Sequence, residues 1–466
     1  MNRVAVLNVV GLTGALLGPD LPAITAYARR GGFTRIRPAF PAVTCTAQAD
    51  YLTGELPARH GIVANGWYHR EAAEVQFWKQ SNHLVRAPRI WETLRREAPG
   101  FTCANLFWWF NMYSSVDYSI TPRPLYPADG RKVFDIHSWP SEIRPAIKQD
   151  LGEFPFPGFW GPAAGVDSPA CRADAVTRWI AASARWIEER HSPTLSLVYL
   201  PHLDYNLQRL GPRHPDIARD LRAVDAIVDG LIEFFAGRGV AVMLLSEYGI
   251  VPVSRAVHLN RLFRARGWLA VKDELGRDLL DAGNSRAFAV ADHQIAHIYV
   301  RDPALLGEVR AALEATPGVA RVLDTADKAA AGLDHERAGD LVAVAEGDAW
   351  FTYYYWGDDA RAPDFARTVD IHRKPGYDPV ELFLDPALRF PKLRIARRLL
   401  QKRLGFRMLM DVIPLDASLV KGSHGAPPAD EGDWPILAVP AGGTPSPATM
   451  ESTAVFGEIR RLILPR

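Results

Sequence analysis

Residues 40–68 read FPAVTCTAQADYLTGELPARHGIVANGWY, and this stretch combines a hydroxyl nucleophile with an anion-binding backbone. Thr44 follows a proline-led turn and starts a segment of helical composition. The first turn of a helix has unpaired N–H groups and the positive end of the helix dipole, so it favours an anion. Asn65 ends the glycine-containing loop that follows and supplies a further side-chain donor. The pattern predicts a phosphate-sized site with Thr44 as nucleophile.

The same residues resemble the nucleophile segment of the alkaline phosphatase superfamily, in particular its nucleotide pyrophosphatase/phosphodiesterase branch. That motif reads approximately P-T/S-x-T-F-P-N-H-x-x-L-V-T-G, followed by P-x-x-H-G-I-x-x-N. The resemblance places Thr44 on the nucleophilic threonine and Asn65 on the phosphate-binding asparagine, while residues 45–48 replace F-P-N-H. It implies an α/β fold, with a mostly parallel central sheet flanked by helices. It also implies hydrolysis of phosphodiester or phosphomonoester bonds with one or two divalent cations (Zn²⁺, Mn²⁺ or Mg²⁺).

Bulk composition is that of a globular protein: 466 residues, of which 48% are hydrophobic and 23% charged. Lys and Arg number 54 against 53 Asp and Glu, so overall charge does not steer the chain toward nucleic acid or an anionic membrane. We interpret the basic stretch 392–407 as a solvated helix face. Three cysteines argue against a disulfide framework, and no apolar run approaches the roughly 18 residues of a membrane span. We therefore expect a cytoplasmic protein without a nucleic-acid polymer as partner.

Short apolar runs alternate with helical patterns along the chain. Strands are expected at Val4–Val10, Thr194–Tyr199, Val240–Leu245, Ala287–Val290, Ile295–Val300 and Leu341–Ala345, and helices at Leu21–Arg30, Asp174–Arg190, Arg219–Phe235 and Pro303–Ala315. This alternation predicts βα units in one α/β domain spanning residues 1–466, with ligands at the carboxyl ends of strands. Two aromatic segments, 107–162 and 346–416, are expected as insertions, the first as a small cap over the site.

One metal-ligand candidate follows the strand at 194–199, in the sequence YLPHLDYNLQRLGP. The family pattern there is approximately P-D-x-x-G-H-x-x-G-P, which places Asp204 on a metal-binding aspartate and Gln208 on a metal-binding histidine. Glutamine is a neutral oxygen donor and a poorer zinc ligand than imidazole. His202 is near enough in sequence to substitute for it. The alternative is that Asp204 only caps a helix or turn.

Two further positions depart from the family pattern. The sequence LLSEYGI puts Glu247 and Tyr248 where relatives have the metal-binding Asp-His pair. Glu247 can still ligate, whereas Tyr248 either donates a hydrogen bond to a phosphoryl oxygen or simply packs at a strand end. Val10 occupies the position of the first-strand aspartate and cannot bind metal. These departures favour an oxygen-preferring ion such as Mn²⁺ or Mg²⁺ over paired Zn²⁺.

The last family motif, S-H-G, matches His424 in LVKGSHGAPP. His372, in DIHRKPGYDP, is held in reserve, because Pro375 replaces the histidine of the related motif G-x-H-G-Y-D. Asp292 and His293, beside an expected strand, are additional polar groups that compensate for missing ligands. The predicted metal ligands are thus Asp204, Glu247, His424, Gln208 and Thr44, with auxiliary candidates Tyr248, His372, His202, Asp292 and His293.

Alternative readings stay open. Cys45 competes as nucleophile, since a thiol at a helix start has a lowered pKa, but Tyr51 stands where the cysteine phosphatase pattern C-x5-R has arginine. The metal pair could also be lost, leaving a binding or scaffold protein, or a phosphoryl or sulfuryl transferase. The expected substrate is a small-molecule phosphoester, including nucleotides. Trp108, Trp109 and Tyr113 would stack against a planar group of this substrate. The alternative is that these aromatic residues only pack the cap against the core.

Overall fold

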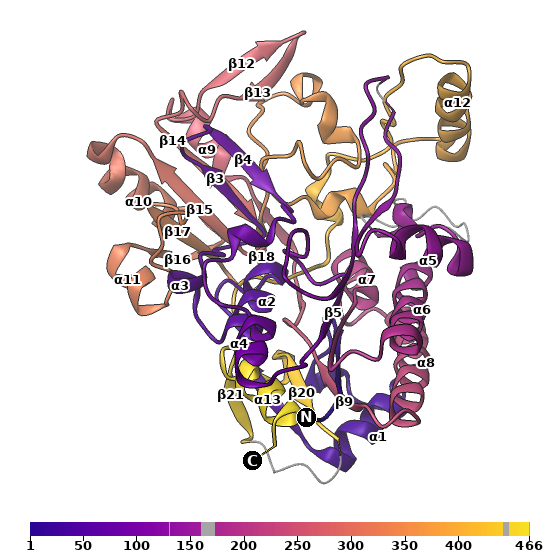
Figure 1. Cartoon of the computed structure of the whole chain (residues 1–466). Coiled ribbons are helices and arrows are strands. Elements are labelled where there is room, and N and C mark those ends of the chain that lie inside the picture. The colour runs from indigo at the N-terminus through magenta and orange to yellow at the C-terminus, as the bar shows by residue number, and fades with distance from the viewer. Residues whose placement is uncertain (130, 160–172, 441–446, 466) are drawn as a thin grey trace.

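The computed structural model describes residues 1–129, 131–159, 173–440 and 447–465, and Cys171 falls outside these ranges. A nine-stranded sheet forms the larger part (Figure 1). Its strands in spatial order are β21 (Thr449–Glu451), β2 (Phe33–Arg37), β20 (Ile436–Ala438), β9 (Ala241–Leu245), β1 (Val4–Val9), β8 (Leu195–Leu200), β5 (Cys103–Leu106), β6 (Tyr118–Pro122) and β7 (Ile136–Trp139).

The centre of this sheet is parallel, as the sequence predicts. β1 pairs in parallel with β8 on one side and β9 on the other. All six residues of β1 are buried, because helices cover both faces of the sheet and a near-continuous apolar run is needed there. Antiparallel pairs occur toward the edges, between β2 and β20, β20 and β9, and β6 and β7. The predicted mostly parallel central sheet is confirmed.

Helices cover both faces of the nine-stranded sheet (Figure 1). One face carries α1 (Pro22–Gly31), α6 (Ala173–His191), α7 (His202–Leu210) and α8 (Ile217–Ala236); the other carries α2 (Thr44–Thr53), α4 (Ile90–Glu97) and α13 (Ala454–Ile463). The sequence of α8 explains its packing, since its buried residues recur every three or four positions and form one apolar stripe: Leu221, Val224, Val228, Leu231 and Phe235. The helices expected near residues 21–30, 174–190 and 219–235 are confirmed.

A second, smaller sheet is antiparallel and has its own hydrophobic core. It contains β14 (Ala287–Asp292), β15 (Ile295–Val300), β17 (Leu341–Ala345) and β16 (Val319–Leu323), in that order. The expectation that these runs belong to parallel βα units was wrong. Only two residues, His293 and Gln294, join β14 to β15, and so short a connection permits only an antiparallel hairpin.

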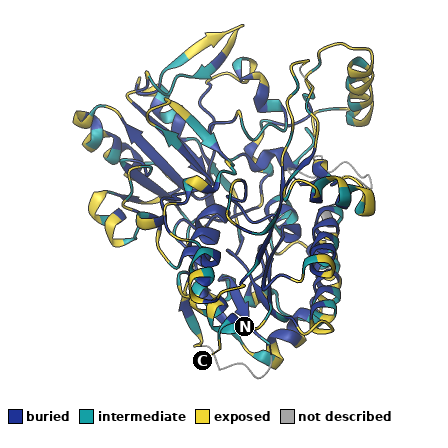
Figure 2. Ribbon diagram, viewed as in Figure 1, coloured by how far each residue is buried: buried dark blue, intermediate teal, exposed yellow. Residues whose placement is uncertain are grey.

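The two aromatic segments are built differently from each other. Segment 107–162, in its described part, adds β6, β7, α5 (Ile143–Leu151) and η3 (Phe156–Gly158) at one edge of the large sheet. Segment 346–416 buries its run WFTYYYW in the second core and then sends α12 (Pro391–Arg403) outward (Figures 1 and 2). The remaining α-helices and strands are α3 (Pro57–His60), α9 (Leu259–Ala265), α10 (Leu306–Glu314), α11 (Thr325–Ala330), β3 (Gly66–His69), β4 (Glu74–Phe77), β10 (Val251–Pro252), β11 (Arg255–Val257), β12 (Val271–Glu274), β13 (Arg277–Leu280), β18 (Ala349–Phe351) and β19 (Gly422–Ser423).

Helix α2 is buried along its whole length and is anchored by a polar cluster. The Asp50 carboxylate accepts a hydrogen bond from His60 Nε2 at 2.9 Å and another from Ser452 Oγ at 2.5 Å. His60 Nδ1 in turn accepts from the N–H of Ile62, which leaves its proton on Nε2 for Asp50. The cluster therefore ties α2 to α3 and to the segment preceding α13.

Removing the Asp50 carboxylate is expected to destabilise the fold strongly. In Asp50→Ala, the buried donors on His60 and Ser452 lose their acceptor, and the free energy of unfolding should fall by about 3 kcal/mol in urea denaturation. The control is Glu336→Ala, which breaks an exposed ion pair with Arg86 and should cost less than about 1 kcal/mol. Equal losses in the two variants would contradict the anchoring role of Asp50.

Candidate active site

A pocket opens at the carboxyl ends of β8 and β9, next to the first residue of α2. Parallel α/β sheets place their ligand sites at this edge. The lining brings together groups from segments far apart in the sequence: Thr44, Trp78, Trp109, Phe159, Tyr199, Pro201, Asp204, Tyr205, Gln208, Tyr248, His293, Ile371, Lys374, Gly376, Tyr377, Asp378, Glu381, Leu382 and His424. Both aromatic segments therefore contribute to the walls.

Thr44 is the first residue of α2 and its side chain lies in the pocket lining. Its Oγ1 lies 3.2 Å from the Oη of Tyr248. The neighbouring Cys45 is buried, and burial raises the pKa of its thiol well above the usual value. Cys45 is thus a neutral packed neighbour, whereas the Thr44 hydroxyl is the nucleophile-type group that reaches the pocket.

Asn65 lies behind Thr44 and fixes the start of α2. Its Oδ1 accepts a hydrogen bond from the backbone N–H of Cys45 at 3.0 Å. Its own backbone N–H and its Nδ2 both donate to the Asp292 carboxylate, at 2.8 and 3.1 Å. The Nδ1 of His293 also bonds Asp292, at 2.8 Å. Burial raises the pKa of Asp292 to about 6, and the hydrogen bonds from Asn65 offset part of this rise.

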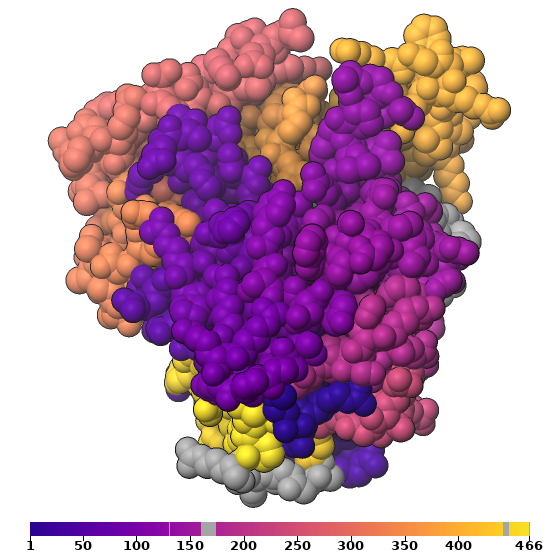
Figure 3. All heavy atoms as spheres, viewed as in Figure 1, coloured from indigo at the N-terminus to yellow at the C-terminus, as the bar shows by residue number. Residues whose placement is uncertain are grey.

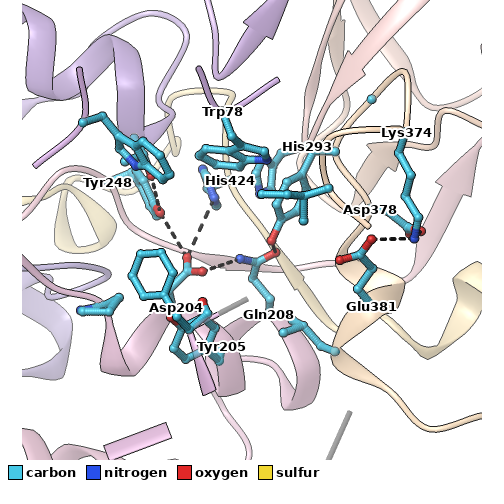
Figure 4. A pocket seen from close by; sticks show the side chains of 18 of the residues that line it. Trp78, Asp204, Tyr205, Gln208, Tyr248, His293, Lys374, Asp378, Glu381 and His424 are labelled. Atoms are coloured by element: carbon cyan, nitrogen blue, oxygen red, sulfur yellow. Dashed lines mark hydrogen bonds and ion pairs between the residues drawn. The ribbon is translucent and has the colours of Figure 1, made fainter. Parts of the chain in front are cut away.

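Asp204 is the polar centre of the pocket (Figure 4). Its Oδ1 accepts from the Oη of Tyr248 at 3.1 Å, and its Oδ2 accepts from the Nε2 of Gln208 at 2.8 Å. Burial raises the pKa of Asp204 to about 6, and these two hydrogen bonds counteract the rise. The Oη of Tyr377 donates to Gln208 Oε1 at 3.3 Å. The predicted pair Asp204 and Gln208 therefore meets here, joined by two tyrosines.

Four aromatic rings stack in succession beside this carboxylate. Ring centroids lie 3.6 Å apart between Tyr248 and His424, 3.7 Å between His424 and His293, and 3.8 Å between His293 and Tyr377. Burial lowers the pKa values of both histidines well below the usual value, so both rings are neutral. Because Nδ1 of His293 donates to Asp292, its Nε2 carries a lone pair. That atom has no hydrogen-bond partner among the described residues.

His424 is oriented as a ligand. Its Nδ1 donates to the backbone carbonyl of Ala42 at 2.8 Å, so the lone pair is on Nε2, which lies 4.0 Å from Asp204 Oδ1. Such a hydrogen bond is typical of metal-binding histidines. Asp204 and His424 each offer one ligand atom to a divalent cation, whereas Gln208 presents its Nε2 to Asp204 and its Oε1 to Tyr377. Within the described part of the chain, however, no cluster of three or more His, Cys, Asp or Glu side chains is spaced to hold a metal.

The second cation position implied by the resemblance does not fit a metal. Val10 is apolar, and Glu247 is surrounded by amide donors, because the Nδ2 of Asn8 and the Nε2 of Gln48 both donate to its Oε1 at 2.5 Å. Burial raises the pKa of Glu247 to about 8, so the side chain is mostly protonated at neutral pH. Hydrogen-bond donors and a proton thus neutralise this carboxylate.

Two histidines named from sequence lie away from this cluster. His202 is buried beside Asp220, with Nε2 3.5 Å from Oδ1, and is not part of the pocket lining. His372 lies on the loop that carries Lys374 and Tyr377, outside the lining; burial lowers its pKa to about 4. The structure thus brings together Thr44, Asp204, Gln208, Tyr248, His293 and His424, with Asn65, Glu247 and Asp292 directly behind them.

The residues 4–378 match the model of a protein family described as type I phosphodiesterase / nucleotide pyrophosphatase. The chain belongs to this family. A curated relative, an uncharacterized pyrophosphatase/phosphodiesterase of Schizosaccharomyces pombe, is 23% identical over 237 residues. The match covers 48% of this chain and 40% of the relative, so the chain spans less than half of that relative's length.

Solved structures share the fold across the whole chain. Murine ectonucleotide pyrophosphatase/phosphodiesterase 5 has a TM-score of 0.59 at 15% identity and covers 99% of this chain and 95% of its own. Phosphonoacetate hydrolase from Sinorhizobium meliloti has a TM-score of 0.61 at 14% identity, covering 99% and 96%. At these identities the likeness shows the alkaline phosphatase-like fold of this phosphodiesterase family member, and no more.

Several residues that line the pocket of this family member, or lie directly behind it, were not singled out from sequence. Tyr377 closes the ring stack, Gln48 and Asn8 hold Glu247, and Lys374 pairs with Asp378 and Glu381 at 2.7 and 2.6 Å on the opposite wall (Figure 4). Gln48 lies in the segment that begins with Thr44, and Tyr377 lies in the sequence GYD. Their positions within these motifs were the sequence feature that could have identified them as site residues. Asn8 lies in β1, whose residues are all buried, and its polarity within an apolar strand was the only clue.

Glu247 should make stability depend on pH in the metal-free protein. Between about pH 4.5 and pH 8 the folded state keeps a proton on Glu247 that the unfolded chain has lost, so the free energy of unfolding falls as pH rises through this window. The side chain of Glu247→Gln cannot titrate. The free energy of unfolding of this variant, measured relative to that of the wild type, should therefore rise by more than about 1 kcal/mol between pH 5 and pH 8.

Urea denaturation of chelator-treated protein at several pH values measures this difference. The matched control is Glu71→Gln, on the exposed turn between β3 and β4, which should follow the wild type. Parallel stability curves for Glu247→Gln and wild type would show that Glu247 is not held protonated.

Proposed function

We propose that this chain hydrolyses phosphodiester or phosphomonoester bonds of small molecules, with Thr44 as the nucleophile. The supporting observation is the place of Thr44: a hydroxyl at the first residue of a buried helix, inside a pocket at the carboxyl ends of parallel strands. The helix start favours the anionic phosphoryl group, and Asn65 holds that helix start in position. Family membership supports the same reaction class.

In the first step, Thr44 Oγ1 attacks phosphorus while the bond to the leaving alcohol breaks. Glu247 lies directly behind this hydroxyl, and its raised pKa of about 8 makes its ionised form a base strong enough to accept the hydroxyl proton. In the second step, water attacks the phosphothreonine and restores the free hydroxyl. Tyr248, within 3.2 Å of Oγ1, donates a hydrogen bond to a phosphoryl oxygen once substrate displaces its contact with Asp204.

We propose a single divalent cation for this site, held by Asp204, His424 and, after a flip of its amide, the oxygen of Gln208. When bound, such an ion neutralises charge on the phosphoryl oxygens. The ligand set is poor in thiolate and imidazole, and this favours Mn²⁺ or Mg²⁺ over Zn²⁺. Asn8 and Gln48 take the place of the second ion by donating hydrogen bonds to Glu247.

The pocket walls favour a substrate with a planar group. Trp78 lies beside Trp109, with ring centroids 5.0 Å apart, and makes an edge contact with Tyr377 at 5.9 Å. Aromatic walls of this kind stack a nucleobase or another flat leaving group. A structure of inactive murine ectonucleotide pyrophosphatase/phosphodiesterase 5 was solved in complex with AMP. We therefore propose nucleotides as the substrate class to examine first.

A second candidate function is binding of phosphoesters without turnover. The observation that favours it is the remodelled second cation position, with Val10 and a mostly protonated Glu247. Binding of AMP to wild type by calorimetry, together with no hydrolysis of any ester under Mn²⁺, Mg²⁺ or Zn²⁺, would support this reading.

Loss of the Thr44 hydroxyl should abolish turnover. Thr44→Ala is expected to lower kcat on bis-p-nitrophenyl phosphate at least about 10³-fold, because no other hydroxyl replaces the covalent step. Thr44→Ser should keep a measurable fraction of the rate. The matched control is Thr53→Ala at the other end of α2, which should leave the rate unchanged. Turnover by Thr44→Ala at the wild-type rate would exclude Thr44 as nucleophile.

Metal content should reflect one cation position. Elemental analysis of protein dialysed against Mn²⁺ is expected to give about one ion per chain, and His424→Ala should lose it because His424 supplies the nitrogen ligand of the proposed set. Glu247→Gln should keep its metal. Two ions per chain, with one lost in Glu247→Gln, would contradict the assignment and restore a two-cation centre.

A further inference from the structure

Helix α12 and its flanks carry an unusual charge pattern. Residues 386–410 contain eight Lys or Arg and no Asp or Glu, although charge over the whole chain is balanced. These cations are Arg389, Lys392, Arg394, Arg397, Arg398, Lys402, Arg403 and Arg407. The segment therefore has a strongly positive local field within a nearly neutral protein.

The same helix exposes apolar side chains at helical spacing. Leu393, Ala396, Leu400 and Leu404 follow one another at intervals of three or four residues, so they lie along one face of α12. The three leucines are 68%, 56% and 64% exposed. Phe390 and Phe406, at the two ends of the helix, are 63% and 66% exposed. An exposed stripe of this length marks an interaction surface, since soluble domains bury such residues.

Contacts on the opposite face of α12 determine the direction in which the leucine stripe faces. Arg394 and Arg398 both pair with Asp411, and Ile395 packs against the second core. The leucine stripe consequently faces away from the body of the protein, where α12 projects from one corner of the molecule (Figures 2 and 3). Lys392, Arg397 and Arg403 flank the stripe and are exposed.

We propose that α12 is a docking helix for an anionic phospholipid surface, lying in the headgroup region with its leucine stripe against the acyl chains. Amphipathic helices with cationic flanks bind membranes in this way, through apolar burial and attraction to anionic lipid together. This mode differs from spanning: none of the described helices is long and apolar enough to cross a bilayer. The inference does not depend on the chemistry proposed for Thr44.

Other occupants explain the surface less well. A second copy of the chain would bring two cationic helices together and pay for like-charge repulsion. A nucleic acid would neutralise the cations but leave the leucine stripe in water. An anionic membrane satisfies both features at once. The 3-10 helix η9 (Pro379–Leu382) precedes α12 on the same segment and contributes Glu381 and Leu382 to the pocket lining. The segment that docks on the membrane is therefore continuous with one wall of the pocket.

Vesicle co-sedimentation of the full chain tests this assignment. The protein should bind vesicles of phosphatidylcholine and phosphatidylglycerol in equal parts and remain in solution with phosphatidylcholine alone. Binding to the mixed vesicles should weaken as salt increases. Absence of binding to both vesicle types would overturn the proposal.

Two triple variants separate the apolar and electrostatic contributions. L393S/L400S/L404S should lower the partition coefficient on mixed vesicles at least tenfold. K392Q/R397Q/R403Q should lower it about 100-fold, because each cation contributes a factor of about five. The matched controls are Leu275→Ser, at the fully exposed tip of the β12–β13 hairpin, and R29Q/R30Q/R59Q, distant surface cations. Both controls should bind like wild type, and thermal unfolding should be unchanged in all four.

Three outcomes would contradict membrane docking. Vesicle binding that survives both triple variants would place the contact elsewhere. Binding to a single-stranded oligonucleotide that requires the cations but not the leucines, without vesicle binding, would assign the helix to nucleic acid. A dimer that dissociates in L393S/L400S/L404S, again without vesicle binding, would assign it to a second copy of the chain.

Discussion

The site depends on one buried carboxylate, Asp292, at the end of β14. It accepts hydrogen bonds from the backbone and side chain of Asn65 and from His293, while Asn65 in turn accepts from the N–H of Cys45, the second residue of α2. Asp292 belongs to the antiparallel sheet, and α2 packs on the parallel one. This network therefore joins the two halves of the molecule where Thr44 and the ring stack meet. Without it, Thr44 and the wall opposite would be positioned independently.

Charge neutralisation in the pocket follows from how each carboxylate is surrounded. Asp204 has a hydroxyl donor, an amide donor and the lone pair of His424 nearby, and in our proposal it shares a cation with His424. Glu247 is fully buried and accepts two amide hydrogen bonds at Oε1, while its Oε2 has no hydrogen-bond partner among the described residues, so protonation is the less costly solution. In the function we propose, these two buried carboxylates thus serve as a ligand and as an acid–base group. Desolvation, rather than any difference in residue type, separates their roles.

Much of the fold was predictable from the sequence. Short stretches of sequence explain which strands were predicted correctly and which were not. β1, β8 and β9 are short apolar runs between amphipathic helices, and such runs are buried strands of a parallel sheet. The strands at 287–300 look the same in sequence, yet the two-residue connection at His293 and Gln294 makes them a hairpin. At the site, Thr44, Asp204 and His424 were accessible from motifs. The roles of Asn8, Gln48 and Tyr377 were not, because each acts through a contact more than 100 residues away in sequence.

The central claim is that a phosphoryl group passes through Thr44. Rapid acid quench of the protein during turnover of bis-p-nitrophenyl phosphate, followed by peptide mass spectrometry, measures this directly, since phosphothreonine esters survive acid. The account predicts a covalent nitrophenyl phosphate on the peptide that begins α2, localised to Thr44. Turnover with no modified peptide, or with the label on Cys45 or Glu247, would contradict it.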